Sequence, residues 1–225
     1  GGMGFIGSAL VRALSSAPCQ IVRLVRPGRH VDSTNTSKAE ISTIEGEIQD
    51  RETWESSLKN ADYVFHFAAQ TSAPRAEEDP LADLNANVVP VIQMLEACRL
   101  LGERPTVLFA GTTTQVGLPP RLPVEESFPD QPIIVYDINK LAAEKYLQYY
   151  SNHIGIPTVT LRLTNVYGPG TNVSSPDRGV LNMMIKRAIE GEPLTVYGKG
   201  ERVRDYVFID DVVRAFLMAG VASGK

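Results

Sequence analysis

A tyrosine and a lysine four positions apart provide the clearest candidate chemistry in the sequence. Tyr136 and Lys140 belong to the segment YDINK, and residues four apart on a helix share one face, so both side chains can reach one site. A phenol, with a pKa of about 10, is a poor base at neutral pH, but a neighbouring ammonium favours the phenolate and lowers that pKa. The pair predicts an acid/base tyrosine supported by a lysine, although this spacing also arises by chance.

A hydroxyl group is expected close to this pair. Thr112 follows the apolar run at residues 106–110, which predicts a buried strand. Ligands bind beyond the carboxyl ends of strands in open α/β sheets, and a hydroxyl there can hydrogen-bond a substrate oxygen while its proton moves. The alternative is a threonine that caps a strand and turn. We predict Thr112, Tyr136 and Lys140 as the catalytic residues.

The first seven residues, GGMGFIG, have the spacing of a dinucleotide-binding turn. Gly1, Gly4 and Gly7 fit the pattern G-x-x-G-x-x-G, in which glycines permit a tight turn and close approach of the backbone to a pyrophosphate at the start of a helix. Such a turn is a weak signal alone, but a helical pattern follows directly. We therefore predict that this turn, including Phe5 and Ile6, binds a dinucleotide.

The residue at the end of the next predicted strand helps to distinguish the two dinucleotides. An acid there accepts a hydrogen bond from the ribose 2′-hydroxyl of NAD, whereas an arginine neutralises the 2′-phosphate of NADP. The sequence has Arg26 at this position, and Arg29 follows closely. The cofactor is thus NAD or NADP, with NADP favoured. Two solvated surface arginines are the alternative.

The periodicity of the chain predicts the scaffold that positions these residues. Runs rich in β-branched residues alternate with helical patterns, which is typical of a parallel sheet covered on both faces. Right-handed crossovers would make it a doubly wound, Rossmann-like α/β fold. The predicted strands are residues 20–25, 41–45, 63–67, 106–110 and 158–163, and the predicted helices are residues 5–15, 52–59, 84–101, 138–152 and 180–190.

The sequence pattern changes after residue 167, where turn-rich sequence replaces the alternation of strands and helices. We predict an NAD(P)-binding domain at residues 1–167 and a partial substrate-binding region at residues 168–225, with return segments to the main domain. A glycine turn of this kind normally follows a strand, and none precedes it here. We therefore expect a fragment of a longer protein, and activity is expected of the full-length parent.

Composition limits the classes of partner. The 225 residues carry 22 Lys+Arg and 26 Asp+Glu, a net charge of −4 without a long basic run, which gives no support for binding nucleic acid or an anionic membrane. No apolar run approaches the roughly 20 residues of a membrane span. The 2 cysteines and 3 histidines have no metal-like spacing, so we expect no metal site and a reducing, cytoplasmic location.

The ordered motifs resemble those of the extended short-chain dehydrogenases/reductases, in the NAD-dependent epimerase/dehydratase family. They are GGMGFIG, VFHFAAQTS, Asn87-Val88-Val89, the segment at Thr112, YDINK, LRLTNVYGPG and VRDYVFIDD. Each motif is modest alone, but the ordered set covers nearly the whole chain. The resemblance implies an enzyme similar to the nucleotide-sugar 4-epimerases, with a small-molecule nucleotide sugar as its substrate and a homodimer as its assembly.

The resemblance also implies roles for individual residues. Thr112 would position the substrate, Tyr136 would be the acid/base, and Lys140 would lower the pKa of the tyrosine and bind cofactor ribose. Further groups would hold the ligands: Glu47 and Ile48 beside the adenine, Phe67, Ala68 and Ala69 along the cofactor, Asn87 near the catalytic helix, and Asn165 and Arg204 at the diphosphate of the substrate. An ion pair with an acid such as Asp205 is the alternative for Arg204.

The residues after Thr112 distinguish between reactions. Relatives that eliminate water carry an acid within two residues of the catalytic hydroxyl, whereas this chain has Thr113 and Thr114. Epimerisation and ketone reduction need only the Thr/Tyr/Lys set and a nicotinamide. We predict NAD(P)-dependent epimerisation of a nucleotide sugar, with an NADPH-dependent ketoreductase and a non-catalytic dinucleotide-binding module as the alternatives.

Overall fold

The computed structural model describes residues 1–28, 38–170, 180–196, 198–201 and 203–223. Within them, all paired strands are parallel. The strands are β1 (Gln20–Val25), β2 (Glu40–Glu45), β3 (Tyr63–His66), β4 (Thr106–Thr112), β5 (Thr158–Leu163), β6 (Asn165–Tyr167) and β7 (Tyr206–Phe208). Parallel strands with flanking helices confirm the predicted Rossmann-like α/β class.

The strands form three hydrogen-bonded groups, β1-β2, β3-β4-β5 and β6-β7, instead of the single continuous sheet that the periodicity predicts. The glycine turn lies between the first two groups. A β-carbon added to Gly2 would lie 3.3 Å from the side chain of Arg23 in β1, and one added to Gly1 would lie 2.6 Å from the carbonyl carbon of Phe67, just after β3. The turn is therefore next to both groups of strands.

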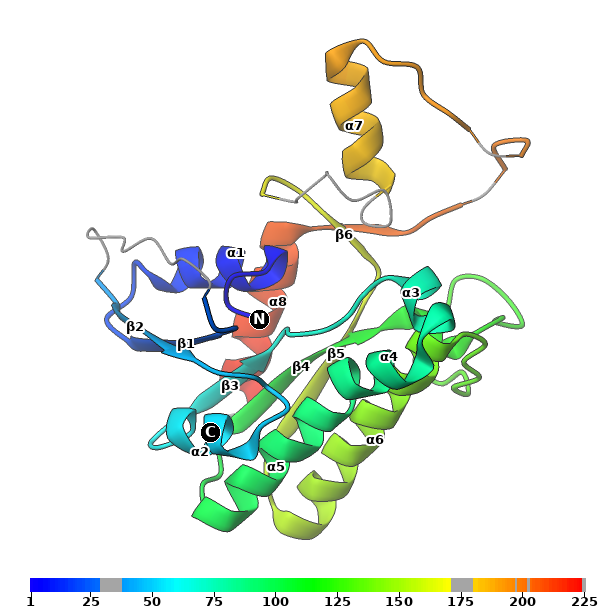
Figure 1. The fold of residues 1–225 in the computed structure, drawn as a ribbon. Coiled ribbons are helices and arrows are strands. Elements are labelled where there is room, and N and C mark those ends of the chain that lie inside the picture. Colours follow the sequence, from blue (N-terminus) through cyan, green and yellow to red (C-terminus); the bar gives the residue numbers. More distant parts are fainter. Residues whose placement is uncertain (29–37, 171–179, 197, 202, 224–225) are drawn as a thin grey trace.

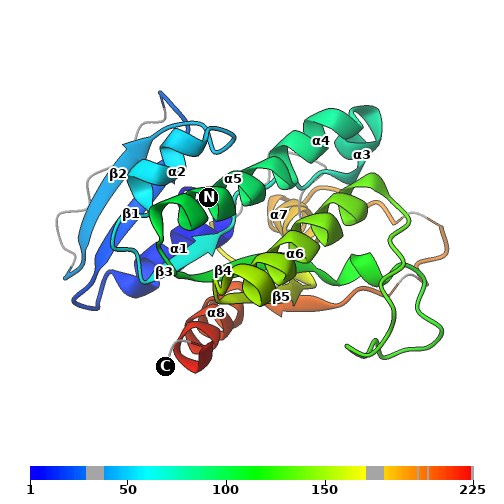
Figure 2. The ribbon, with the colours of Figure 1, turned by 90° about the horizontal axis from the view of Figure 1, so that it is seen from below.

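Helices cover both faces of β4 and β5 (Figures 1 and 2). On one face, α8 (Ile209–Ser223) packs on the strands and against α1 (Phe5–Leu14). On the other face, α6 (Val135–Ile154) packs on the strands and beside α5 (Val89–Leu101), which in turn contacts α2 (Arg51–Ser57). The sheet thus has a helical layer on each side.

Shorter elements gather near the first turns of α6. They are α3 (Ala73–Glu78), α4 (Pro80–Asn87) and the 3-10 helix η1 (Thr113–Val116), and each contacts α6. Helix α7 (Val180–Glu190) stands apart from the α/β body at the top of Figure 1. The start of α6 is therefore the point where several connecting segments meet.

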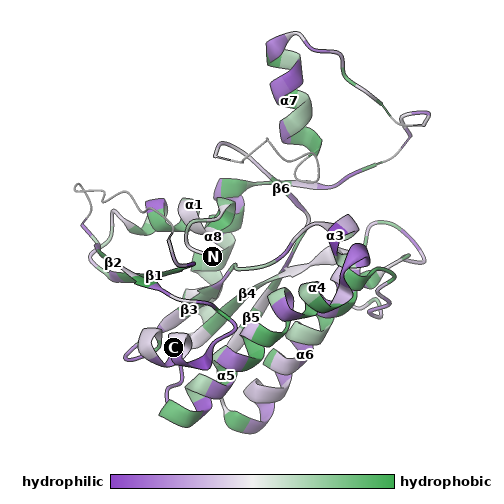
Figure 3. Ribbon diagram, viewed as in Figure 1, coloured by the Kyte–Doolittle hydropathy of each residue, from purple (hydrophilic) through white to green (hydrophobic). Residues whose placement is uncertain are grey.

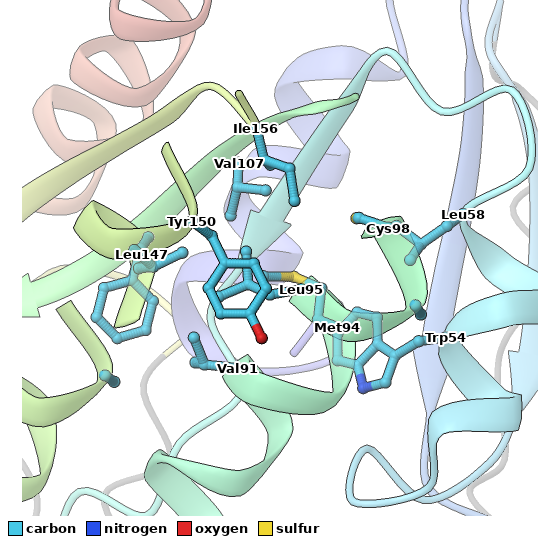
Figure 4. Close-up of a cluster of buried hydrophobic side chains, with 13 residues drawn as sticks. Trp54, Leu58, Val91, Met94, Leu95, Cys98, Val107, Leu147, Tyr150 and Ile156 are labelled. Carbon is cyan, nitrogen blue, oxygen red and sulfur yellow. The ribbon is translucent and has the colours of Figure 1, made fainter. Parts of the chain in front are cut away.

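An apolar cluster fills the space between the sheet and the layer of α2, α5 and α6 (Figure 4). Met94, Leu95 and Leu147 are fully buried in it, and burial of a side chain of this size contributes about 1.5–3 kcal/mol. The indole nitrogen of Trp54 donates a hydrogen bond to the carbonyl oxygen of Ile48 at 2.7 Å. In Figure 3, hydrophobic and hydrophilic residues alternate along α5 and α6, as expected of helices with one face on a core.

The helix predicted over residues 84–101 is wrong, because two helices occupy this region. Helix α4 ends at Asn87 and α5 begins at Val89. Pro90 explains the break, since it lacks an N–H group and its ring clashes with the carbonyl group four residues earlier. By contrast, the helix predicted over residues 138–152 is longer than expected and begins at Val135, so that Tyr136 lies in its first turn.

Candidate active site

The first two turns of α6 present the predicted tyrosine and lysine. A carboxylate supports the start of this helix, because Oε1 of Glu77 accepts a hydrogen bond from the Val135 N–H group at 2.8 Å, where the helix dipole favours negative charge. Lys140 is 3% exposed, and its Nζ lies 3.9 Å from the centre of the Phe109 ring. Among the described residues, this ammonium makes no hydrogen bond or ion pair, so its donors remain available to a ligand.

Burial dominates the protonation of both groups. It lowers the pKa of Lys140 to about 7, although Asp83 and Glu144 oppose this shift. It also raises the pKa of Tyr136 to about 12, with further increases from Asp137 and Asp83. The predicted lowering of the tyrosine pKa by Lys140 is therefore not found among the residues of this chain. The physical reason is that burial of Lys140 disfavours its charged form, and the charged form is the one that would stabilise a phenolate.

Thr112 reaches the first turn of α6 through a chain of hydrogen bonds. It is buried at the end of β4, and its Oγ1 lies 2.7 Å from Oγ1 of Thr114 in η1. Thr114 in turn donates to Oδ1 of Asp137 at 2.5 Å. Asp137 is 2% exposed, and burial raises its pKa while the hydrogen bond from Thr114 lowers it. The structure thus links Thr112 to the neighbour of Tyr136.

Sequence reasoning did not identify this link. In the sequence, Thr114 is notable only as a position that lacks a carboxylate, and Asp137 only as a residue between the tyrosine and the lysine. The structure places the Asp137 carboxylate against the Thr114 hydroxyl, 23 residues away in the chain. The signal in the sequence is an acidic residue beside the predicted catalytic tyrosine. It does not indicate which side chain the acid contacts.

The glycine turn has the close contacts that its predicted role requires. A β-carbon on Gly7 would lie 2.1 Å from the carbonyl oxygen of Gly1, and one on Gly1 would lie 2.5 Å from the backbone nitrogen of Ala68. Gly4 is the N-cap of α1 and provides no side-chain hydrogen bond to the helix. Glycine is therefore required at Gly1 and Gly7, and the uncapped first turn of α1 can bind an anion such as a pyrophosphate.

Other predicted cofactor residues surround this turn. Phe67 and Ala68 lie against Gly1, and Ala69 follows them in the chain. The side chains of Phe5 and Ile6 pack on the apolar cluster around Ala9 and Leu10, so they anchor the start of α1. The structure thus places Phe67 and Ala68 beside the glycine turn, and the role of residues 67–69 along a cofactor stays a prediction.

The predicted adenine end lies beyond β1 and β2. Arg26 is exposed directly after β1, and the backbone N–H group of Gly28 donates to Oε2 of Glu45 at 3.1 Å. Glu47 is exposed, whereas Ile48 packs against the apolar cluster of Figure 4. Arg29, the second arginine of the NADP argument, lies outside the described residues.

Asn87 is 1% exposed and has a fixed amide orientation. Its Nδ2 donates to the carbonyl oxygen of Gln70 at 3.1 Å and to Oδ1 of Asp83 at 2.9 Å. Its Oδ1 is buried without a hydrogen-bond partner among the described residues. A buried acceptor without a partner is costly, so Asn87 fits a place beside a ligand that donates a hydrogen bond.

The two predicted diphosphate residues lie at the starts of the paired strands β6 and β7: Asn165 begins β6, and Arg204 is two residues before β7. Asn165 is paired with Tyr206, and both its backbone nitrogen and its Nδ2 donate to the carbonyl oxygen of Asp205, at 3.2 and 2.9 Å. Arg204 is exposed next to this pair, and its guanidinium donates to the carbonyl oxygen of Val203 at 2.9 Å. Within the described part of the chain, Arg204 forms no ion pair, so the alternative pairing with Asp205 is not seen.

Comparison with known proteins identifies the family of the chain. A family model described as "NAD dependent epimerase/dehydratase family" matches residues 1–224. The chain belongs to this family. Family membership confirms the resemblance seen in the ordered motifs and, in its description, names NAD as the cofactor.

Relatives within the family include several 4-epimerases. UDP-glucose 4-epimerase from Mycolicibacterium smegmatis is 34% identical over 230 residues, which cover 100% of this chain and 72% of the relative. The structure of UDP-glucose 4-epimerase from Thermotoga maritima with UDP-glucose has a TM-score of 0.85 and 33% identity, over 97% of this chain and 71% of that one. The enzyme from Thermus thermophilus in complex with NAD has a TM-score of 0.84 and 30% identity, over 97% and 72%.

The described residues hold neither a metal cluster nor a membrane-spanning helix. No group of three or more His, Cys, Asp or Glu side chains within them is placed to hold a metal ion. None of the helices in the same residues is long and apolar enough to cross a membrane.

Proposed function

We propose that the protein is an NAD-dependent 4-epimerase of a nucleotide-activated sugar. The observation that carries this proposal is that two segments meet: the end of β4, which bears Thr112, and the first turns of α6, which bear Tyr136 and Lys140. The hydrogen-bonded link from Thr112 to Asp137 supports it, as does the similarity to UDP-glucose 4-epimerases.

The proposed reaction divides its work between the cofactor and the side chains. NAD would be held by the glycine turn, the segment at Phe67 and Lys140, and it would supply the uptake and return of a hydride at the sugar carbon. Tyr136 takes the proton of the sugar hydroxyl as a phenolate and gives it back as a phenol, while the Thr112 hydroxyl positions the same oxygen. Lys140 in its charged form favours the phenolate. Glu144 assists indirectly, because it favours the charged form of Lys140, whereas Asp83 favours that form but also raises the pKa of Tyr136.

We infer that NAD is the cofactor in preference to NADP. The Glu45 carboxylate lies against the turn that follows Arg26, and its negative charge would oppose a 2′-phosphate that Arg26 attracts. Titration with each dinucleotide tests this, since tighter binding of NADP would support the expectation drawn from Arg26. The substitution Arg26→Ser should leave NAD affinity within about twofold, because an exposed arginine contributes little to binding an uncharged ribose hydroxyl.

We propose a UDP-sugar as the substrate, with Asn165 and Arg204 near its diphosphate. The relatives named above act on UDP-glucose by their descriptions. Arg204 is exposed and has its charge available, and a guanidinium is well suited to bind phosphate oxygens. The residues from 168 onwards contribute the substrate-binding region in this proposal, and α8 is a return segment to the main domain.

The decisive experiment incubates the full-length protein with UDP-glucose and no added cofactor, and follows the appearance of the 4-epimer by chromatography. An epimerase turns over with the dinucleotide it already holds, because the hydride is returned in each cycle. Turnover that appears only with added NADPH would instead indicate a ketoreductase.

The substitution Tyr136→Phe separates catalysis from binding. It removes the phenolic oxygen and keeps the ring, so NAD affinity should stay within a few-fold while turnover falls by about 100-fold or more. Equal turnover in the variant would contradict the role of Tyr136. Binding of NAD without any turnover of a sugar panel by the unmodified protein would favour the non-catalytic module.

We also propose a homodimer in a reducing, cytoplasmic location. Apolar side chains are exposed on the two long helices of one layer, among them Leu100 at 52%, Ile138 at 49% and Tyr149 at 54%, and such a face suits a second copy of the chain. Light scattering at micromolar concentration tests the dimer.

Both cysteines are unpaired, which fits a reducing compartment, and cell fractionation tests the location.

A further inference from the structure

A buried carboxylate collects three amide side chains beside the candidate active site. Asp83 on α4 is 1% exposed. Its Oδ1 accepts hydrogen bonds from Gln70 Nε2 at 2.9 Å and from Asn87 Nδ2 at 2.9 Å, and its Oδ2 accepts one from Asn139 Nδ2 at 2.7 Å. We call Asp83, Gln70, Asn87 and Asn139 the amide cluster. It joins the segment after β3, helix α4 and helix α6.

In two members of the amide cluster, both amide hydrogens take part in hydrogen bonds. Gln70 Nε2 donates to Asp83 and to the Ser72 carbonyl oxygen, and Asn87 Nδ2 donates to Asp83 and to the Gln70 carbonyl oxygen. Both side chains have only two amide hydrogens, so their orientations are fixed. All three hydrogen bonds to Asp83 come from amide N–H groups, so both of its oxygens act as acceptors in this cluster.

The fixed orientation of Asn87 has a consequence for a ligand. With both amide hydrogens used, the side chain can offer a ligand only its buried Oδ1, an acceptor that has no partner among the described residues. Asn139, held by the other oxygen of Asp83, is three residues after Tyr136 and one before Lys140 on α6. One carboxylate thus fixes both an acceptor and the helix that bears the tyrosine and the lysine.

We propose that Asp83 is a positioning residue, which holds Asn87 and helix α6 so that Asn87 Oδ1, Tyr136 and Lys140 face one bound dinucleotide. The proposal rests on the proposed function and deepens it at the same site. The Asn87 oxygen receives an N–H or O–H group of the dinucleotide, and Asp83 itself does not touch the ligand. Lys140, whose charged form Asp83 favours, forms the opposite side of the same site.

An exchange of the side chains at positions 83 and 139 tests the proposal. Asn139→Asp places a second carboxylate against Asp83, and we expect NAD affinity and kcat each to fall by about 10-fold to 100-fold, since small displacements of catalytic groups have effects of this size. In the double variant Asp83→Asn with Asn139→Asp, the new amide oxygen at position 83 accepts from Gln70 and Asn87, while its nitrogen donates to the carboxylate introduced at position 139. We expect the double variant to regain NAD affinity and kcat to within about threefold of the unmodified protein, as the restored hydrogen bonds return the catalytic groups to their places.

Stability is separated from positioning by a matched control. Leu147→Ala removes a fully buried side chain of α6 from the apolar cluster, and it should lower stability by about 2–5 kcal/mol. All variants are assayed under conditions where circular dichroism shows them folded. The control should keep kcat and NAD affinity close to those of the unmodified protein, whereas Asn139→Asp should lose both.

Two outcomes overturn the proposal. One is an Asn139→Asp variant that keeps NAD affinity and kcat within about twofold, and the other is a double variant no better than Asn139→Asp alone. NAD affinity is measured by calorimetry without any sugar. If the unmodified protein binds NAD but epimerises no nucleotide sugar, the proposed function fails while the affinity series still tests Asp83. If it binds no NAD, both proposals fail.

Discussion

Helix α6 carries buried charge at two places, and the structure treats the two places differently. Near its middle, Arg162 of β5 binds Glu144 at 2.8 Å and Asp130 at 2.8 Å, and Gln115 adds a hydrogen bond to Glu144 at 2.9 Å. We call these four residues the ion-pair cluster. Near the start of α6, the charges of Asp83, Asp137 and Lys140 are buried, and none of them forms an ion pair within the described residues.

This difference indicates different tasks. The ion-pair cluster joins η1, the segment before α6, α6 and β5, and each of its charged groups has a partner of opposite sign. At the start of α6, hydroxyl and amide groups satisfy the acids, and the lysine keeps its donors free. Unpaired buried charge costs stability, so its presence at the start of the helix favours a binding or catalytic role over a structural one.

Removal of the arginine from the ion-pair cluster should have the largest effect on stability. Arg162→Met leaves the Glu144 side chain, which is 5% exposed, without its cation. We expect a loss of about 3 kcal/mol, at the lower end of the range for buried pairs because the Arg162 side chain is 25% exposed. Urea unfolding measures the change.

A second substitution checks the cause of this loss. Adding Glu144→Leu to Arg162→Met removes the orphaned charge, and we expect part of the stability to return, since apolar replacements of buried pairs are tolerated. A double variant that is even less stable than Arg162→Met would mean that packing, not charge, explains the first result.

Removal of the lysine at the start of α6 should have a smaller effect of opposite sign. Lys140→Met replaces a buried cation by an apolar chain of similar length, and one pKa unit corresponds to about 1.4 kcal/mol. We expect the free energy of unfolding to rise by about 1 kcal/mol at pH 6. The gain is limited because Asp83 and Glu144 lose a nearby cation. Turnover should be lost. Thermal unfolding and the epimerase assay measure the two effects.

The pH dependence of this gain follows from the direction of the lysine shift. The folded-state pKa of Lys140 is about 7, below its ordinary value of 10.5, so between these values the unfolded chain binds more protons. Stability of the unmodified protein therefore rises with pH across this window. The advantage of Lys140→Met should be constant below about pH 6, and should fall and then reverse towards about pH 10. A constant advantage over the whole range would contradict a buried ammonium.

Loss of the middle hydroxyl in the Thr112 chain should affect activity more than stability. Thr114→Val keeps the shape of the side chain but removes the donor to Asp137. We expect a stability change of about 1 kcal/mol and a fall in kcat of about tenfold, because the Thr112 hydroxyl loses its orientation. Thr114→Ser, which keeps the hydroxyl, should retain most of the activity; equal kcat in both variants would exclude the link.

An exposed ion pair should have the smallest effect. Arg121 and Glu125 lie 2.7 Å apart, with side chains 67% and 47% exposed. Arg121→Ala should change stability by at most about 0.5 kcal/mol, and urea unfolding beside Arg162→Met provides the comparison. A loss as large as that of Arg162→Met would show that burial does not distinguish the two pairs.

Much of the scaffold was predictable because its signals are local. The strands at residues 20–25 and 158–163 have the predicted bounds, since β-branched runs and their turns lie within a few residues. The break between α4 and α5 also had a local signal in Pro90, although the apolar periodicity of residues 84–101 obscured it. By contrast, the side-chain hydrogen bonds of Gln70 with Asp83 and of Thr114 with Asp137 join residues that are far apart in the sequence. Neither helical nor strand periodicity predicts such pairs.

The sequence by itself determined the parallel α/β class, the glycine turn, and the tyrosine and lysine on one helical face, because each follows from the spacing of neighbouring residues. Only the tertiary structure decided the protonation of Tyr136 and Lys140 and the partners of Asp83, Asp137 and Glu144. Burial and contact depend on which distant segments pack together, and the pKa of a group and the partners of a polar side chain depend on burial and contact.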